Sequence, residues 1–491
     1  METNSVIPLI AVFLPWLAVA AIAFLPKEEQ RLKKIVHVAV SVAAFGLVVS
    51  LLPRALDGQA FNFKLFSITD NLRIALRVDT LGYYFGLLIS FMWMLATIYS
   101  LRYVDHKEDR YYGFLLLVLS FSLGAAFAEN MITYFIFYEL MTFGSYPLIV
   151  HEETAEARQA ALKYLVYAIF GGSVLLFALI AHFYWGQNLS FNGAGVLSAA
   201  SISRAALITI FVAYLVGFGV KASIMPLHGW VPDAHPAAPA PASALLSGVI
   251  LKLGAFGIIR VVFNVFGVAL FKQLNLDLVL AIVASVTIIL ASIFALTQDN
   301  LKRRLAYSSI GQVSYILLGL GLLSQDAALG GVMHIAHHAL MKGCLFFCAG
   351  IIIIETGKRN ISDMEGIGFR LPVTMLCFSV AALAMMGIPP SAGFVTKWLL
   401  GVGSLQAREG FFIIVLMISS LLNAAYFLPI IYTAFFKGEK QPLGWRGETS
   451  KAMLWPTCVV AFLVVFAGIY ITMPGLPYSL VKIVVRAFVG G

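Results

Sequence analysis

Five lysines lie inside long apolar stretches of this chain, where charged side chains are rare. They are Lys163, Lys221, Lys252, Lys342 and Lys397. The acidic residue nearest the middle of such a stretch is Glu139, in YFIFYELMTFGSYPLIV (134–150). A charge at the centre of a membrane helix costs about 2.5–3.5 kcal/mol, so these groups are expected to face the protein interior, pair with one another or contact water.

The use of lysine in particular predicts proton transfer. Burial lowers the pKa of an ammonium group from its usual value of about 10.4, and a neighbouring carboxylate raises it again. A buried lysine therefore binds or releases a proton according to the distance of its anion. Arginine keeps its proton under all ordinary conditions and cannot act in this way.

A proline follows one of these lysines closely. In VGFGVKASIMPLHGW (216–230), Pro226 comes five residues after Lys221. Proline removes a backbone donor, and irregular backbone is tolerated at membrane depth only where protein or water surrounds it. The pattern predicts a hydrated cavity beside a broken helix. The alternative is an ordinary proline kink, with Lys221 extending toward the interface.

A second set of titratable residues lies in GGVMHIAHHALMKGCLFFCAG (330–350). His334, His338 and Lys342 are spaced i, i+4 and i+8, which places them on one helix face as a proton wire. His337 and Cys344 lie on another face and allow a zinc alternative. A four-ligand set is not visible, so we predict no metal site.

Other candidates have two interpretations each. Lys252 lies near the middle of the helix after Lys221 and could link the two halves. Lys163 either takes part in the relay or contacts a loop. His228, Asp233 and His235, in PLHGWVPDAHP (226–236), either form a cytoplasmic proton-uptake site or cap a proline-rich loop.

The composition indicates the elements that hold these residues. The chain of 491 residues is 60% hydrophobic and 12% charged, whereas soluble domains are about 25% charged. We predict an all-α integral membrane protein with about fourteen transmembrane helices. The expected spans are 5–25, 35–53, 81–101, 113–128, 130–150, 161–184, 205–233, 242–268, 277–297, 303–323, 328–355, 371–405, 411–436 and 452–474. Prolines interrupt 205–233 (Pro226) and 371–405 (Pro389 and Pro390).

The distribution of lysine and arginine among the loops indicates which side of the membrane each loop faces. Most of them fall in 27–34, 102–110, 300–304, 355–360 and 437–451, which predicts that this side is cytoplasmic and that both termini lie outside the cytoplasm of a prokaryotic inner membrane. This distribution accounts for the net charge of +9 without nucleic acid. The 54–80 connection alternates enough to form a small external hairpin.

A faint internal repeat divides the chain. Aligning ALKYLVYAIFGG (161–172) with LMKGCLFFCAGI (340–351) pairs Lys163 with Lys342, and nearly the same offset relates Lys221 to Lys397. Paired interrupted helices point to a transport site. We expect N-terminal helices in 1–112, a first five-helix repeat in 113–268 (helices 4–8), a second in 269–440 (helices 9–13), and a last helix with a tail in 441–491.

Several activities are excluded. The four cysteines form no C-x-x-C pair, no phosphate-binding glycine motif lies between a strand and a helix, and the histidines lack the spacing of a haem site. We expect no cofactor and no bond-making chemistry in this chain.

Longer motifs carry a family resemblance. GFGVKASIMPLHGWVPDAHPAAPAPASALLSGVILKLG (217–254), YEL around Glu139, and SSIGQVSYILLGL (308–320) resemble the antiporter-like subunits of complex I, Mrp-type cation/proton antiporters and membrane-bound hydrogenases. Lys397, in GIPPSAGFVTKW (387–398), looks more like the D-type subunit of Mrp antiporters or the related hydrogenase subunit, because some complex I members have glutamate there. The longest members carry a lateral helix after the fourteenth span, which we do not expect here.

The resemblance implies a role for each residue. Glu139 would pair with Lys221, and their separation would drive a proton toward Lys252. The residues His334, His338 and Lys342 would carry it on, with Lys397 at the exit.

The function predicted is proton translocation within a multisubunit membrane complex, with other membrane subunits, and in some members a hydrogenase or NADH- or ferredoxin-oxidising arm, as partners. The alternatives are a stand-alone Na⁺/H⁺ exchanger, which would need more intramembrane carboxylates, and a non-conducting structural subunit.

Overall fold

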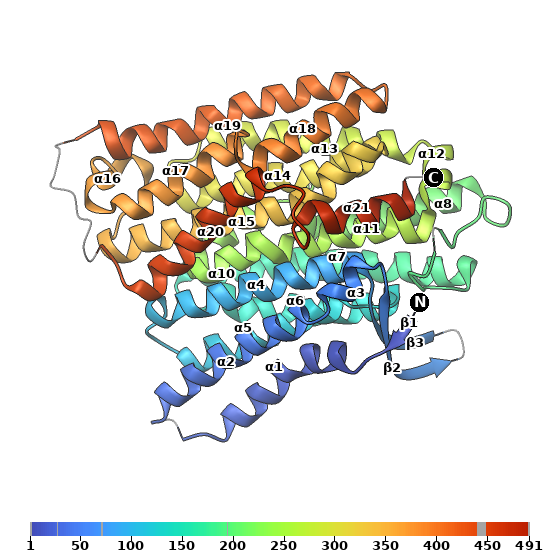
Figure 1. Ribbon diagram of the computed structural model, residues 1–491, viewed down its shortest axis with the longest axis horizontal. Helices are drawn as coiled ribbons and strands as arrows, with labels where there is room; N and C mark the ends of the chain where they lie inside the picture. Colours follow the sequence, from blue (N-terminus) through green and yellow to red (C-terminus); the bar gives the residue numbers. More distant parts are fainter. Residues whose placement is uncertain (1, 27, 70–71, 194, 439–447, 490–491) are drawn as a thin grey trace.

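The protein is a bundle of long, roughly parallel helices (Figure 1). The computed structural model describes residues 2–26, 28–69, 72–193, 195–438 and 448–489. Within these ranges, ten helices are long and apolar enough to cross a membrane, and two shorter helices are also apolar. The predicted all-α membrane fold is confirmed. Each of the predicted spans coincides with a helix or a chain of helices, while their number as membrane crossings stays a prediction.

The helices before the first break are α1 (Ile7–Ala23), α2 (Gln30–Val49), α3 (Leu52–Leu56), α4 (Thr80–Tyr103), α5 (Glu108–Ala126), α6 (Met131–Ile149), α7 (Ala155–Gly186) and α8 (Arg204–Ala222). Next come α9 (Val231–Ala237), α10 (Ala240–Leu245), η1 (Leu246–Ile250), α11 (Leu251–Arg260), η2 (Val261–Phe266), α12 (Val268–Gln273), α13 (Leu276–Leu296), α14 (Leu301–Leu322) and α15 (Gln325–Thr356). The last are η3 (Ile361–Asp363), α16 (Ile367–Arg370), α17 (Pro372–Met386), α18 (Ala392–Gln406), α19 (Phe411–Phe436), α20 (Lys451–Ile469) and α21 (Pro477–Phe488).

A small sheet covers one end of the bundle, the end at which both termini lie (Figure 1). Strands β2 (Ala60–Thr69) and β3 (Leu72–Val78) pair antiparallel, and β1 (Glu2–Asn4) adds to β2 in parallel. The hairpin predicted within 54–80 is therefore present, while its external position stays a prediction. Arg73 of β3 donates to the carboxylate of Glu129, between α5 and α6, which ties the hairpin to the helices.

Both predicted helix breaks are present. Helix α8 ends at Ala222, where Ser223 adopts the left-handed conformation, and α9 begins after Pro226. Helix α17 likewise ends at Met386, with Gly387 left-handed, and α18 starts at Ala392. Each break leaves carbonyl groups at the end of the first half-helix without intrahelical partners.

The predicted helix 242–268 contains two π-helical segments that the sequence did not indicate. Here η1 and η2 flank α11, and all of their residues are buried. A π-turn shifts the backbone hydrogen bonds by one residue, and the shift does not alter the apolar pattern of a helix that is buried on every side.

Loops rich in basic residues gather at the end of the bundle opposite the termini (Figure 1). Lys33 and Lys34, at the start of α2, form ion pairs with Asp109 and Glu108 at the start of α5. In the predicted loop 437–451, residues 439–447 lie outside the described part of the chain, as does the expected domain boundary at 440/441. The tail holds α21, a short helix that was not predicted and that packs on α4 and α15.

Glycines bring the central helices together. A Cβ on Gly319 of α14 would lie 2.7 Å from the Cα of Gly331 on α15. In membranes, close backbone approach through small residues replaces the hydrophobic driving force between helices. The contact holds α14 and α15 close enough for their polar side chains to meet.

Candidate functional site

Lys221 is buried at the end of the first broken helix. It lies in the last turn of α8, where the carbonyl end of a helix favours a cation, and it is 2% exposed. Its Nζ donates to Thr142 Oγ1 and to Tyr164 OH, both at 2.8 Å. The ammonium also lies over the rings of Tyr164 and Tyr138, at 4.8 and 5.5 Å from their centroids. Neutral oxygens and aromatic faces thus solvate this charge.

Glu139 lies one turn before Thr142 on α6 and does not reach Lys221. Among the described residues, the two form no ion pair, and Glu139 Oε1 is buried without a hydrogen-bond partner. The carboxylate rests against Gly172 of α7. Phe143, one turn further along the face of Glu139, is 52% exposed, so the carboxylate lies near the outer surface of the bundle. The pair implied by the resemblance is therefore separated in this structure.

Lys252 is fully buried just after the π-turn η1. Its Nζ donates to the carbonyl of Ser247 at 2.6 Å, a group that the π-turn places within reach. The hydroxyl of Ser247 lies 2.7 Å from that of Ser309 on α14. Lys252 thus connects the first half of the chain to α14 through one serine pair.

Lys342 of α15 bonds to the turn of α14 that contains Ser309. Its Nζ donates to Leu305 O at 2.9 Å and to the hydroxyl of Ser308. The hydroxyl of Ser309 also donates to Leu305 O, at 2.9 Å. A run of polar groups (Ser247, Ser309, Leu305 O and Ser308, the serine bridge) therefore lies between Lys252 and Lys342. Sequence reasoning used SSIGQ only as a family signature and missed this contact.

The two histidines of the predicted wire face each other on α15. The rings of His334 and His338 stack at 5.5 Å between centroids with an interplanar angle of 4°. His334 Nδ1 lies 3.0 Å from Thr396 Oγ1, and its Nε2 lies 2.9 Å from Gln312 Oε1. Because a hydroxyl both donates and accepts, the ring can change protonation at Nδ1 without losing its partner. Both ring nitrogens of His338 are buried without a partner in the described structure.

Lys397, on α18, bonds back across the second helix break to the end of α17. Its Nζ donates to Met385 O at 3.0 Å, to Met386 O at 2.8 Å and to Ser420 Oγ at 3.0 Å. These are carbonyls that the break at Gly387 leaves free, so a helix end again stabilises the lysine. The ammonium also lies 5.6 Å from the ring centroid of Tyr315.

A cavity of about 710 Å³ opens among the loops rich in basic residues. The segments 103–106, 151–160, 233–239, 300–303 and 353–359 contribute its lining. Asp233 bridges two cations there, with Lys163 at 2.7 Å and Arg303 at 2.8 Å. Lys163 is exposed and does not lie deep in the bundle. Its contact with Asp233 agrees with the interpretation in which it contacts a loop and takes no part in the relay.

Two buried polar residues, Lys302 and His235, belong to the segments that line the cavity. Lys302 is 5% exposed and donates to the carbonyls of Pro236 and Ala238. His235 is fully buried, stacks on Phe346 and has two ring nitrogens without a partner among the described residues. Sequence reasoning placed Lys302 in a loop because it stands beside Arg303 and Arg304, so only the fold reveals its burial.

The remaining candidates lie apart from this line. His228 packs near Tyr307, with ring centroids 6.3 Å apart. His337 is buried on another face of α15, and Cys344 donates instead to Cys377 O at 3.4 Å. Arg260 is 1% exposed and is paired with Asp79 through two hydrogen bonds, at 2.7 and 2.8 Å.

Comparison with known proteins gives consistent matches. The family model described as NADH:quinone oxidoreductase/Mrp antiporter, TM, matches residues 128–423. NADH-quinone oxidoreductase subunit N of Desulforudis audaxviator is 32% identical over 485 residues, covering 94% of this chain and 96% of the relative.

Solved structures share the fold over nearly the whole chain. A chain of the membrane-bound sulfane sulfur reductase, an archaeal respiratory membrane complex, superposes with a TM-score of 0.86 at 25% identity, covering 98% of this chain and 96% of that one. A chain of the Mrp complex from Dietzia sp. gives a TM-score of 0.85 at 20% identity, covering 98% and 97%.

Proposed function

The chain belongs to the NADH:quinone oxidoreductase/Mrp antiporter transmembrane family, and we propose that it moves protons along the buried line from Glu139 and Lys221 to Lys397. It is a multi-pass membrane protein and an antiporter-like subunit, and proton translocation is the role of its family. The residues that carry the proton are the proposal.

One observation supports this route above all. The ammonium groups of Lys221, Lys252, Lys342 and Lys397 bond to neutral oxygens, and none of them forms an ion pair with a described carboxylate. A buried charge without a counter-ion is costly. Each lysine therefore favours passing its proton to the next group, which a permanent ion pair would oppose.

The order of the groups follows from their contacts. Lys252 is joined to Lys342 by the serine bridge, and His338 lies within electrostatic reach of both lysines. His334 stacks on His338 and contacts Thr396, the residue before Lys397. In the proposed route the proton passes from Lys252 through these groups to Lys397.

Between Lys221 and Lys252, the helices α8 and α11 are in direct backbone contact. A Cβ on Gly254 of α11 would collide with Phe218 O and Lys221 C on α8, so the two helices touch between the lysines. The described side chains do not bridge this gap by hydrogen bonds. Water in a transiently opened space is the proposed carrier.

The separated state of Glu139 supports a switch. When the carboxylate approaches Lys221, it stabilises the ammonium, and when it withdraws, the proton is released toward Lys252. The outward position of Glu139 suits control by a neighbouring subunit. We infer that such a subunit packs beside α6 and α7, since the solved chains that share this fold belong to membrane complexes.

The finer assignments are also proposals. The two broken helices support two five-helix units, within 113–268 and 269–440. The loops rich in basic residues are placed in the cytoplasm of a prokaryotic inner membrane, with both termini outside. The parent complex is an Mrp-type antiporter, a membrane-bound hydrogenase or a complex I-like oxidoreductase, with a redox arm in the last two cases and Na⁺ as the counter-ion in the first.

The test is proton uptake into inverted membrane vesicles that contain the parent complex. We expect Glu139→Gln, Lys221→Met and Lys221→Arg each to reduce the rate by about 100-fold, the lower limit for a positioned proton-transfer group. Lys221→Arg keeps the charge and removes only the ability to release the proton. Lys272→Arg, at an exposed position, is the matched control.

Undiminished uptake in all three variants would identify a non-conducting subunit. Na⁺-driven proton movement by the purified chain alone in liposomes would instead support the stand-alone exchanger.

A further inference from the structure

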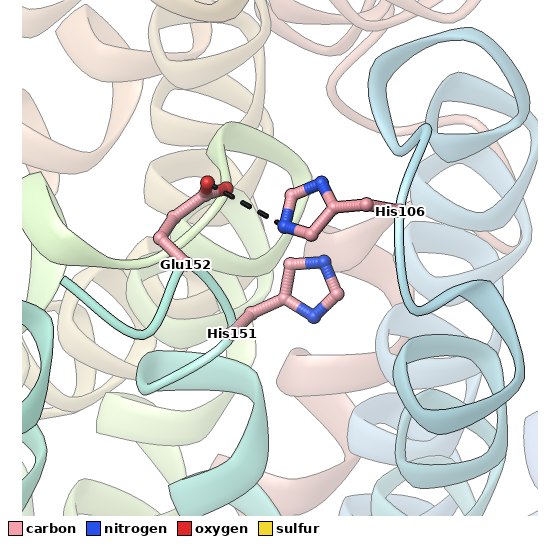
Figure 2. Close-up of side chains that lie close together, drawn as sticks. All are labelled: His106, His151 and Glu152. Atoms are coloured by element: carbon pink, nitrogen blue, oxygen red, sulfur yellow. Dashed lines mark ion pairs between the residues drawn. The ribbon is translucent and has the colours of Figure 1, made fainter.

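Two histidines and a glutamate that the proton route does not use meet at the rim of the cavity. His106 follows α4, and His151 and Glu152 follow α6 (Figure 2). One candidate ligand atom from each residue lies within 4.8 Å of the other two. All three residues line the 710 Å³ cavity.

The orientation of His106 is that of a metal ligand. Its Nδ1 lies 3.0 Å from Asp105 Oδ1, which leaves Nε2 to face Glu152 Oε2 at 3.7 Å. Metal-binding histidines commonly donate their second ring N–H to a carboxylate in this way. Two ligands in a tetrahedral zinc site, at about 2.0–2.1 Å from the metal, lie about 3.3 Å apart. The His106–Glu152 pair is close to this spacing, and an inward movement of the three ligand atoms from their present separations, which are within 4.8 Å, would complete the geometry.

His151 provides an independent observation. It is 1% exposed, and neither ring nitrogen has a hydrogen-bond partner among the described residues. A buried imidazole without a partner is costly, which makes such a group conspicuous. Its ring lies 4.6 Å from that of His106, and Arg110 fixes its backbone by donating to His151 O at 2.8 Å.

Among the described residues, Glu152 forms an ion pair with His106 and with no lysine or arginine. Lys107 and Arg110 both pair with Glu153, and Lys163 and Arg303 pair with Asp233. The carboxylate of Glu152 therefore lines the cavity without a bonded lysine or arginine, and the buried Lys302 of the same wall lies within its electrostatic reach.

We propose that His106, His151 and Glu152 bind Zn²⁺, with the fourth position open to the cavity. Two imidazoles and one carboxylate suit zinc, whereas Mg²⁺ and Ca²⁺ prefer oxygen ligands alone. Asp105 orients His106 from behind. This binding is a property beyond proton translocation.

Zinc at this place has a consequence that rests on the proposed function. The same cavity wall includes Lys302 and Asp233, and the loops that line it are those placed in the cytoplasm, the side from which inverted vesicles take up protons. A bound divalent cation repels protons and occupies the rim. Zn²⁺ therefore inhibits proton uptake from this side.

The first experiment measures binding alone. The full chain is purified in detergent, stripped with a chelator and titrated with Co²⁺ as a spectroscopic probe and with Zn²⁺ by competition. We expect one tight equivalent and the absorption bands of tetrahedral Co²⁺. Asp105→Asn should weaken binding by about 10- to 100-fold, as for other residues that orient a ligand.

His106→Gln and Glu152→Gln should weaken binding by more than that. Glu156→Gln, which removes a carboxylate from the same cavity, should leave it unchanged. Since His151→Gln could disturb folding, the decision rests on His106→Gln, because His106 is only half-buried. Equal affinity of His106→Gln and the unaltered chain overturns the site.

The second experiment measures proton uptake with Zn²⁺ in vesicles. The unaltered complex should be inhibited, and the His106→Gln complex should resist inhibition at the same Zn²⁺ concentration. Binding without inhibition overturns the regulatory consequence but keeps the site. Absence of uptake in the unaltered complex without zinc counts against the proposed function and leaves the binding result standing.

Discussion

The carboxylate of Glu139 lies directly over Gly172 on the neighbouring helix α7. A Cβ at Gly172 would stand 2.8 Å from Oε1 and 2.9 Å from Cδ, closer than real Cβ atoms approach. Because glycine has no Cβ, Gly172 leaves room for the carboxylate of Glu139, which is proposed to control the protonation of Lys221.

Gly172→Ala is expected to displace Glu139 without removing it. A displacement that costs about 1.4 kcal/mol in the proton-transfer step lowers the rate tenfold. Proton uptake in vesicles measures the effect. Gly113→Ala is the matched control, since a Cβ there meets nothing within 4 Å. An unchanged rate in Gly172→Ala would show that the exact place of the carboxylate is unimportant.

Ser309→Ala should slow transport by interrupting the serine bridge. The substitution removes the 2.7 Å contact to Ser247 and the bond to Leu305 O. Each lost hydrogen bond is worth about 0.5–1.5 kcal/mol, so a decrease in uptake of at least two- to tenfold is expected. Ser314→Ala, whose hydroxyl bonds among the described residues to Ile310 O of its own helix alone, should transport normally. Equal rates in the two variants would remove the bridge from the route.

Arg260→Met should destabilise the fold more than it affects transport. Arg260 is 1% exposed and pairs with Asp79 through two bonds, and breaking a buried pair costs about 3–5 kcal/mol. Thermal unfolding in detergent gives the measurement. The double variant Arg260→Met/Asp79→Asn should recover much of the loss, because no uncompensated charge remains. A double variant as unstable as the single one would contradict this explanation.

The loop ion pair around Glu153 should make stability depend on pH. Hydrogen bonds from Lys107 and Arg110 hold the pKa of Glu153 at about 2, below its ordinary value of 4.5. The folded state therefore gains from Glu153 above pH 4.5, and the gain disappears as the pH falls toward 2. The unfolding temperatures of the unaltered chain and of Glu153→Gln should differ at pH 7 and converge in that range. A constant difference would mean that the pair does not titrate as described.

Much of the architecture was predictable because the bilayer acts on each segment separately. Any stretch that crosses the membrane must be apolar and must satisfy its own backbone, so composition alone indicates the helices. Pro226 and Pro389–Pro390 mark both breaks for the same local reason. Lysine at the deep positions likewise predicts a proton-binding function from its chemistry, before any contact is known.

The contacts between segments required the tertiary structure. Ser247 and Ser309 are far apart in the chain, and hydroxyls of this kind are common on membrane helices, so nothing local marks them as a bridge. Lys302 and Arg260 stand near helix ends, where sequence reasoning assigns basic residues to the interface, and only packing shows that both are buried. The separation of Glu139 from Lys221 is also a fact of packing.

The amino-acid sequence thus determined which groups can carry a proton and which segments cross the membrane, because both depend on side-chain chemistry in a low-dielectric medium. The tertiary structure decided which of these groups meet. Distances between helices are set by close contacts such as Gly319 with Gly331 and Gly254 with α8, and these involve residues distant in the chain.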